Sequence, residues 1–187
     1  MRLSLLNSDK ANDVMLLFRD TFSDSEGISE GELIGNLAYE ILTTTDEKDF
    51  VCFAAQDETT IAACIMFSRL SFEQGETAFL LSPVAVGTQY QRQGLGQRLI
   101  QFGLSSLKEK EVANRMLADS VKGVLTYGDP NYYSKVGFKP ISESVIKAPL
   151  KLSYPDGWLG QSLTGEPIKP IAGNSRCINA FNKPEIW

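Results

Sequence analysis

The fold of this chain is decided by residues 81–100, which read LSPVAVGTQYQRQGLGQRLI. Residues 78–86 form an almost unbroken apolar run whose length is typical of a buried strand. After a short polar turn, apolar side chains recur at helical spacing, with Leu95, Leu99 and Phe102 in one row. The stretch therefore predicts a strand, a turn and a helix, in that order.

Two glycines, Gly94 and Gly96, stand where the turn becomes the helix. Glycine lets a backbone turn sharply and lets a ligand approach main-chain amides closely. Unpaired amides at a helix start, together with the helix dipole, favour an anion, and Arg92 and Arg98 add positive charge. Ordinary packing of a helix on a strand uses the same pattern, so a phosphate site and a structural turn both stay open at this point.

Two common nucleotide-binding signatures do not fit these glycines. No Gly-Lys-Ser/Thr follows, as a P-loop requires. Leu99 occupies the position of the third glycine of the dinucleotide-binding fingerprint. A nicotinamide-binding domain is therefore disfavoured.

Composition and charge narrow the class of protein. The chain has 187 residues, 43% of them apolar, which suits one globular domain over 1–187 with a loop-rich extension over about 153–187. A net charge of −5 disfavours a nucleic-acid partner and suits a cationic one, such as an amine. We see neither a leader pattern nor a run of about 20 apolar residues, so we expect a cytoplasmic protein with no membrane partner.

The chain contains no histidine, which excludes Ser-His and Cys-His nucleophiles and histidine-based zinc sites. Its three cysteines, Cys52, Cys64 and Cys177, are far apart, and the first two lie in apolar runs. We expect core thiols, with neither a disulfide nor a metal site.

The remaining pattern predicts a mixed α/β domain in the order β, α, α, β, β, β, α, β, α, β. Ser8 is a candidate cap for the first helix, and Ser29 with Glu32 forms a capping box for the second. The strands in this order are expected at 2–6, 50–56, 61–70, 78–86, 120–127 and 141–152, and the helices at about 9–22, 29–42, 95–107 and 130–136. Residues 177–181 are a candidate for one more strand after them.

Pro83 lies inside the decisive strand. Proline cannot donate to a sheet ladder, so it marks a strand edge or a bulge. A bulge at Ser82-Pro83 would splay this strand from its later neighbour and open a slot just before the glycine turn.

A second motif lies at residues 128–138, which read GDPNYYSKVGF. Asp129 is a candidate N-cap and Pro130 suits the first helical position, while Gly137 suits the C-terminal cap. A short helix is therefore predicted here. On it Tyr132 shares a face with Val136, whereas Tyr133 is turned by about 100°, which favours Tyr132 as the core residue and Tyr133 as the site residue.

Together these motifs resemble the GNAT N-acetyltransferase superfamily. The residues QRQGLG resemble its acetyl-CoA signature, Gln/Arg-x-x-Gly-x-Gly/Ala, and YYSKVGF resembles the later segment that carries a tyrosine. The resemblance covers about residues 50–138 and is closest to small bacterial members with Gly-Asp-Pro before the tyrosine pair. It implies a central mixed, mostly antiparallel sheet with splayed strands, flanked by helices.

The resemblance also implies an acetyl-CoA site without a metal. Backbone groups of the bulged strand would pair with the pantetheine arm, an amide at Val84 or a neighbour would bind the oxyanion, and Tyr133 would act as general acid. The alternative for both tyrosines is packing alone. The implied cofactor-binding residues are Val84, Ala85, Val86, Gln91, Arg92, Gln93, Gly94, Leu95, Gly96, Gln97 and Asn131.

The general base is left open. An ammonium acceptor must lose a proton before it attacks, but residues 79–86 contain no carboxylate. The candidates, each of which also reads as a solvated surface group, are Glu26, Glu30, Glu32, Glu73 and Glu76.

The sequence therefore predicts an acetyl-CoA-dependent N-acetyltransferase that acts on a small, cationic amine by direct attack. The alternatives are acetylation of a protein lysine or N-terminus, and a non-catalytic acyl-CoA-binding regulatory module. Self-association into a homodimer is left open.

Overall fold

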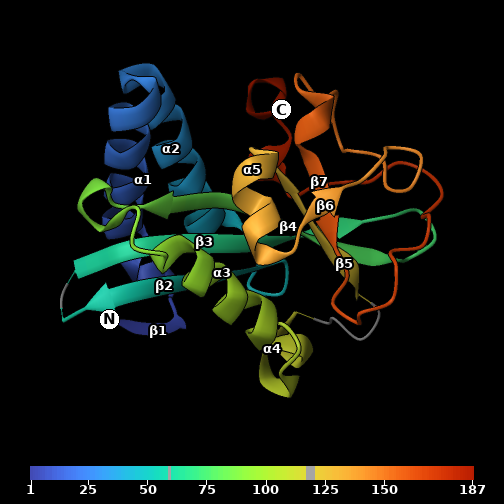
Figure 1. The fold of residues 1–187 in the computed structure, drawn as a ribbon, viewed down its shortest axis with the longest axis horizontal. Helices are drawn as coiled ribbons and strands as arrows, with labels where there is room; N and C mark the ends of the chain where they lie inside the picture. Colours follow the sequence, from blue (N-terminus) through green and yellow to red (C-terminus); the bar gives the residue numbers. More distant parts are fainter. Residues whose placement is uncertain (59, 117–120) are drawn as a thin grey trace.

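The computed structural model describes residues 1–58, 60–116 and 121–187 (Figure 1). Its seven-stranded sheet has the order β1-β2-β3-β4-β5-β7-β6, and only the β4–β5 pair is parallel. This confirms the mixed, mostly antiparallel sheet. The strands are β1 (Arg2–Leu5), β2 (Phe50–Asp57), β3 (Thr60–Ser71), β4 (Thr77–Val86), β5 (Val121–Tyr127), β6 (Lys139–Pro140) and β7 (Trp158–Gln161). The helices are α1 (Ala11–Glu26), α2 (Ile28–Thr44), α3 (Leu95–Ser106), α4 (Lys110–Arg115) and α5 (Pro130–Tyr133).

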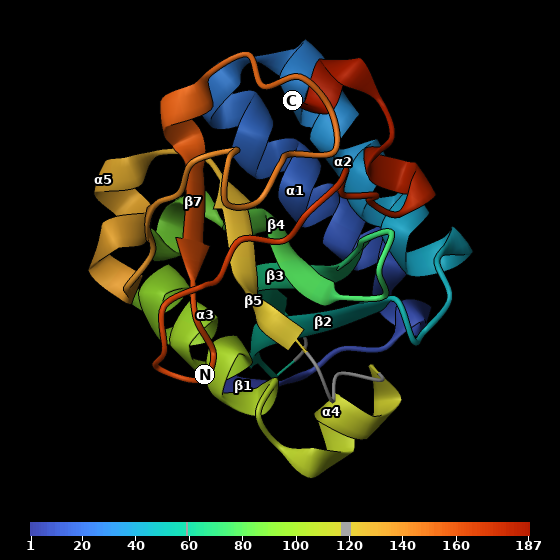
Figure 2. The same ribbon diagram turned by 90° about the vertical axis from the view of Figure 1, so that its right-hand side faces the viewer.

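Helices cover both faces of the sheet. The paired helices α1 and α2 lie on one face, and α3 lies on the other (Figure 1). Each face has its own hydrophobic core, because alternate residues of a strand point to opposite sides. We call the core on the α1–α2 side the first core and the core on the α3 side the second core. The C-terminal segment returns to the α1–α2 side, where Phe181 and Trp187 are buried (Figure 2).

The bulge predicted at Ser82-Pro83 is present. In the β3–β4 register Val84 faces Ile65 and Leu81 faces Phe67, so Ser82 and Pro83 together stand opposite one residue of β3. The Ser82–Pro83 peptide bond is cis. On its other side, β4 pairs with β5 only as far as Leu80 and Leu125. The two strands therefore part beyond this point and leave the expected slot.

The turn after β4 uses left-handed backbone at two positions. Arg92 has φ +59° and Gly94 has φ +74°, and Gly94 is the N-cap of α3. Glycine adopts this conformation without steric cost, whereas most residues do not. At the second motif Asp129 caps α5 by accepting a hydrogen bond from the Asn131 amide at 2.9 Å, as predicted.

Both N-terminal helices begin differently from the prediction. Gly27, at φ +101°, is the N-cap of α2, so Ser29 and Glu32 form no capping box. Asn7 rather than Ser8 precedes the first helical turn. Gly27 alone makes the turn between the two helices, so α1 continues to Glu26 and α2 begins at Ile28. The longer loop expected between the helices is therefore not formed.

Two predicted strands near the C-terminus are wrong. Residues 141–152 form turns and irregular backbone. Apolar and polar residues alternate there because Ile146, Ala148 and Leu152 are buried in the first core. Residues 179–181 form a single 3₁₀ turn. The strand that pairs with β5 on the side away from β4 is β7, which begins at Trp158. The Trp158 indole donates to the Ile146 carbonyl at 2.9 Å. The helix α4 was not predicted, and the expected start of a strand at Ser120 lies outside the described residues.

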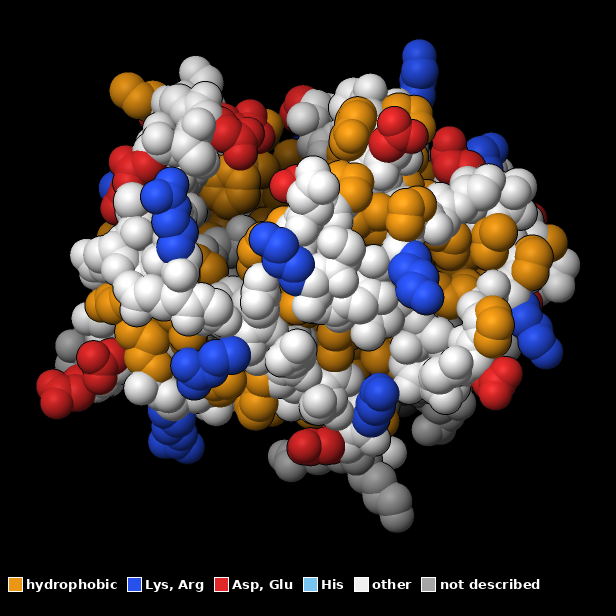
Figure 3. Space-filling view, viewed as in Figure 1, with side chains coloured by type: hydrophobic (Ala, Val, Ile, Leu, Met, Phe, Trp, Pro, Cys, Tyr) orange, Lys and Arg blue, Asp and Glu red, His pale blue; other side chains and the backbone are white. Residues whose placement is uncertain are grey.

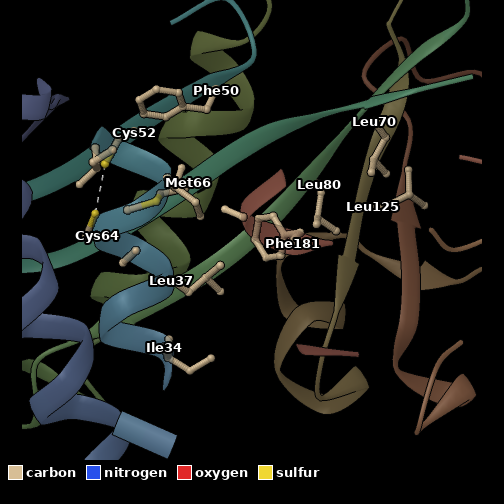
Figure 4. Packing of buried hydrophobic residues seen from close by; sticks show 14 of the residues in the cluster. Ile34, Leu37, Phe50, Cys52, Cys64, Met66, Leu70, Leu80, Leu125 and Phe181 are labelled. Atoms are coloured by element: carbon tan, nitrogen blue, oxygen red, sulfur yellow. Dashed lines mark hydrogen bonds between the residues drawn. The ribbon is translucent and has the colours of Figure 1, made fainter. Parts of the chain in front are cut away.

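The cysteines are free thiols, as expected. Cys52 and Cys64 are buried side by side in the first core, with their Sγ atoms 3.2 Å apart (Figure 4). Burial raises the pKa of Cys64, and the adjacent Cys52 thiol adds to that rise. Within the described residues, no helix is long and apolar enough to cross a membrane.

Candidate functional site

The main cleft, of about 1050 Å³, lies where β4 and β5 part. Figure 3 shows it as a hollow between the α1–α2 pair and α5, with hydrophobic side chains inside and acidic ones on its upper rim. Its volume reaches the upper end of the range of about 300–1,000 Å³ that is usual for ligand sites. Five segments line it: the end of α1 with the start of α2, the end of β4, the turn after β4, the region from Tyr127 to Lys135, and the C-terminal segment.

Most of the predicted site residues line this cleft. Val84 and Val86 come from the separated end of β4, and Tyr133 comes from α5 on the opposite wall. The turn contributes Gln91, Arg92, Gly94, Leu95, Gly96 and Gln97. The fold therefore brings residues from two separate sequence motifs together in one cavity.

Three predicted residues do not line the cleft. Ala85 is buried in the first core, because it alternates with Val84 and Val86 along the strand. Gln93 turns its side chain back to donate to the Gln89 carbonyl at 3.2 Å. Asn131 donates from its side-chain amide to Asp129 at 3.1 Å, so it supports the cap of α5.

The turn has the bare backbone that a pyrophosphate group needs. A Cβ atom built on Gly94 meets nothing within 4 Å, so this face of the backbone is open to the cleft. A Cβ atom on Gly96 would collide with the Tyr132 hydroxyl and lie 3.0 Å from Val86 Cγ2. Only glycine therefore fits at position 96, in the first turn of α3, where amides without helical partners and the positive end of the dipole favour an anion. These residues fit coenzyme A.

Tyr133 is held at the slot by close packing. Its ring makes edge-to-face contacts with Tyr132 and Phe138, at centroid distances of 5.1 and 5.8 Å. A Cβ atom on Gly128 would lie 2.8 Å from Tyr133 Cε2, so glycine is required there. Burial raises the pKa of Tyr133 to about 12, and a hydrogen bond with Thr126 opposes that rise. The phenol is therefore protonated throughout the physiological pH range and is a permanent hydrogen-bond donor.

Thr126, a neighbour of this phenol, links the two strands that form the slot. The Thr126 hydroxyl is fully buried and donates to the Leu81 carbonyl at 2.9 Å, across the last contact between β4 and β5. This hydrogen bond ties β4 to β5 just beyond their last paired residues, Leu80 and Leu125, at the point where the strands part.

Replacing Thr126 with valine is expected to destabilise the protein by about 1–3 kcal/mol, since the Leu81 carbonyl loses its buried donor. For a chain of this size that loss lowers the melting temperature by about 3–8 °C. Thermal unfolding followed by circular dichroism measures the effect. Thr126→Ser keeps the hydroxyl and is the control, and equal melting temperatures for the two variants would contradict the assigned hydrogen bond.

Tyr132 takes part in the cleft more than predicted. Its side chain packs against the second core, as expected, but it also lines the cleft beside Gly96. Burial raises the pKa of Tyr132 as well. Both tyrosines therefore contact the cavity, one beside the glycine turn and the other at the slot.

Acidic and aromatic side chains form the other end of the cleft. Glu26 and Glu30, two of the candidate bases, line it, whereas Glu32, Glu73 and Glu76 do not. The C-terminal segment adds side chains that the sequence did not single out: Tyr154, Glu185 and Trp187. The only signal for them was the presence of large apolar residues in a tail rich in proline and glycine.

Comparison with known proteins places these features in a family. Residues 11–138 match the acetyltransferase (GNAT) family. The chain is 27% identical over 156 residues to the uncharacterized N-acetyltransferase YjhQ of Escherichia coli K12, which covers 80% of this chain and 78% of that protein. It is 32% identical over 87 residues to the uncharacterized N-acetyltransferase YhbS of the same strain, covering 46% of this chain and 47% of YhbS.

Solved structures share the fold over almost the whole chain. A GNAT family acetyltransferase from Brucella melitensis in complex with acetyl-CoA has a TM-score of 0.71 at 19% identity, covering 97% of each chain. E. coli YhbS in complex with CoA has a TM-score of 0.73 at 22% identity, covering 97% of this chain and 92% of the other.

Proposed function

Because this chain belongs to the acetyltransferase (GNAT) family and is an acetyl-CoA-dependent acyltransferase, we propose that it transfers acetyl to a small, cationic amine in the main cleft. One observation carries the proposal: the open glycine turn, the parted ends of β4 and β5, and Tyr133 all face one cavity whose far end is acidic. Residues 153–187 supply part of that end, so we take the chain as one functional domain.

Acetyl-CoA supplies the acetyl thioester. Amides of the turn, over 91–97, bind the pyrophosphate, and Arg92 adds positive charge beside them. The backbone of Val84 to Val86 pairs with the pantetheine arm in place of the missing β5 partner. A Val84 amide directed at the carbonyl oxygen stabilises the oxyanion because the donor is in place before charge develops.

The Tyr133 hydroxyl donates a hydrogen bond to the leaving sulfur as the carbon–sulfur bond of the thioester breaks. An alkyl thiol has a pKa of about 8.5, far below the pKa of about 12 of Tyr133. Full proton transfer from this phenol to a thiolate is therefore unfavourable by about 5 kcal/mol. A hydrogen bond that strengthens as negative charge builds on sulfur is the role that fits, and the proton that finally neutralises the thiolate comes from the acceptor's nitrogen.

The acceptor end of the cleft selects a cation. Glu26, Glu30 and Glu185 line it together with the aromatic side chains of Tyr154 and Trp187. Carboxylates raise the local concentration of an ammonium group, and aromatic faces attract it. Either Glu26 or Glu30 can accept its proton through water before the nitrogen attacks.

Glu26→Gln and Glu30→Gln are each expected to raise the KM for a cationic amine about two- to fivefold, because exposed ion pairs contribute up to about 1 kcal/mol. Steady-state kinetics at low and high salt measures the effect, which should shrink at high salt. Glu32→Gln is the matched control, since Glu32 is exposed on α2 and does not line the cleft. An equal rise for all three variants would contradict the assignment.

A screen of small amines and lysine peptides, with thiol release as the readout, tests the function itself. We expect release with small diamines or amino sugars and little with peptides. Release with peptides alone would favour a protein lysine or N-terminus as acceptor. Tight CoA binding with no release in any well would favour a regulatory acyl-CoA-binding module.

A further inference from the structure

A second pocket opens from the main cleft beside the slot, and its volume is about 150 Å³. Six residues line both cavities, including Val84 and Tyr133, so the two are continuous at the point where the thioester is proposed to lie. The residues that line only the second cavity are Ile34, Leu37, Leu80, Ser82, Pro83 and Phe181. We call this cavity the apolar pocket.

The apolar pocket is built into the first core. Ile34 and Leu37 of α2 stand on one side, and Leu80 of β4 and Phe181 stand on the other (Figure 4). These four side chains are between 1% and 9% exposed. Among the described residues, no side chain that lines the pocket carries a charge.

We propose that the apolar pocket holds the chain of an acyl group longer than acetyl, so that the enzyme also uses thioesters up to about hexanoyl-CoA. This inference rests on the proposed function, because it takes the thioester to lie between Val84 and Tyr133. In the reaction the amine nitrogen forms a bond to the acyl carbon and the carbon–sulfur bond breaks. The sulfur keeps the electron pair, and the proton lost by the nitrogen neutralises it.

The position of the pocket favours the acyl chain, rather than the acceptor amine, as its occupant. The carboxylates suited to an ammonium group, Glu26, Glu30 and Glu185, line the main cleft and not the apolar pocket. An ammonium group moved into the pocket would lose its hydration without gaining a charged partner. A methylene chain attached to the carbonyl carbon gains from the same surroundings.

The size of the pocket sets an upper limit on chain length. An apolar cavity of about 150 Å³ accepts a molecule of the size of benzene, which has six carbon atoms. Hexanoyl extends acetyl by four methylene groups and fits within that volume. Each methylene that is fully buried tightens binding by up to about fourfold.

The test is a series of dissociation constants measured by calorimetry for CoA, acetyl-CoA, butyryl-CoA and hexanoyl-CoA. With the unaltered chain we expect hexanoyl-CoA to bind at least about tenfold tighter than acetyl-CoA. Ile34→Phe, which fills the pocket, should abolish this gain and leave acetyl-CoA within about twofold. Leu33→Phe adds the same bulk to α2 outside both cavities and should keep the gain.

Hexanoyl-CoA binding no tighter than acetyl-CoA to the unaltered chain would overturn the inference and assign the pocket to an apolar part of the acceptor. An equal loss in the Ile34 and Leu33 variants would overturn it as well. Ile34→Ala enlarges the pocket and does not overpack the core, so the dissociation constants of hexanoyl-CoA and acetyl-CoA are compared in this variant as well. Failure of CoA itself to bind would overturn the proposed function, whereas CoA binding without a chain-length effect overturns only this inference.

Discussion

Tyr133→Phe is expected to lower the turnover number by about 10²–10³-fold, while the dissociation constant of CoA changes by less than about twofold. The ring keeps its packing against Tyr132 and Phe138, so the slot keeps its shape. The variant loses the donor that stabilises charge on the departing sulfur. Steady-state kinetics together with calorimetry separates the two quantities.

Tyr132→Phe is the matched control, because Tyr132 lies on the same short helix and also lines the cleft. We expect its turnover number to stay within a few-fold of the unaltered enzyme. Equal losses in the two variants would contradict a specific role of the Tyr133 hydroxyl, and an unchanged turnover number in Tyr133→Phe would show that this tyrosine acts through packing alone.

The raised pKa of Tyr133 also constrains the pH profile. A pKa of about 12 keeps the phenol protonated below that pH, so activity should not fall on the alkaline side through loss of this proton. Any alkaline limb between about pH 8 and 10 therefore belongs to another group, and Tyr133→Phe should lower the whole profile without moving it. A limb that disappears in the variant would contradict this assignment.

Gly94→Val is expected to weaken CoA binding by about ten- to hundredfold. The reason differs from the crowding that a glycine turn first suggests, since nothing lies within 4 Å of a Cβ atom at this position. The cost comes from φ +74°, a conformation that a β-branched residue adopts only with strain of about 1–3 kcal/mol. The turn relaxes away from that conformation, and its amides no longer converge on the pyrophosphate.

Gly75 provides the control for that variant. It has φ +89°, equally open surroundings and a position in the β3–β4 turn, and it does not line the cleft. Gly75→Val should therefore cost similar stability and leave the dissociation constant of CoA unchanged. Unchanged CoA affinity in the Gly94 variant would contradict the role of the turn.

The parts of the fold that the sequence predicted are those set by local signals. The apolar run of β4, the bulge at Pro83, the glycine turn and the Asp129 cap each depend on residues close in the chain. The β7 strand depends on a distant partner, β5, and on the Trp158 anchor, so nothing local distinguished it from loop. The alternation over 141–152 came from burial of an irregular segment, which copies the pattern of a strand.

The candidate site divides in the same way. The cofactor half follows from two motifs, although the sequence could not separate side chains that face the cleft from those that do not, as Ala85, Gln93 and Asn131 show. The acceptor half includes Tyr154 and Glu185, which the long return of the C-terminal segment brings to the cleft. Such a placement depends on tertiary packing, so no spacing of residues in the sequence predicts it.

A crystal structure of the protein with acetyl-CoA tests the central claim most directly. We predict the pyrophosphate on the amides of 91–97, the pantetheine arm between β4 and β5, and the sulfur within hydrogen-bonding reach of the Tyr133 hydroxyl. A complex in which the pyrophosphate lies away from the turn, or in which the sulfur points away from Tyr133, would contradict the account.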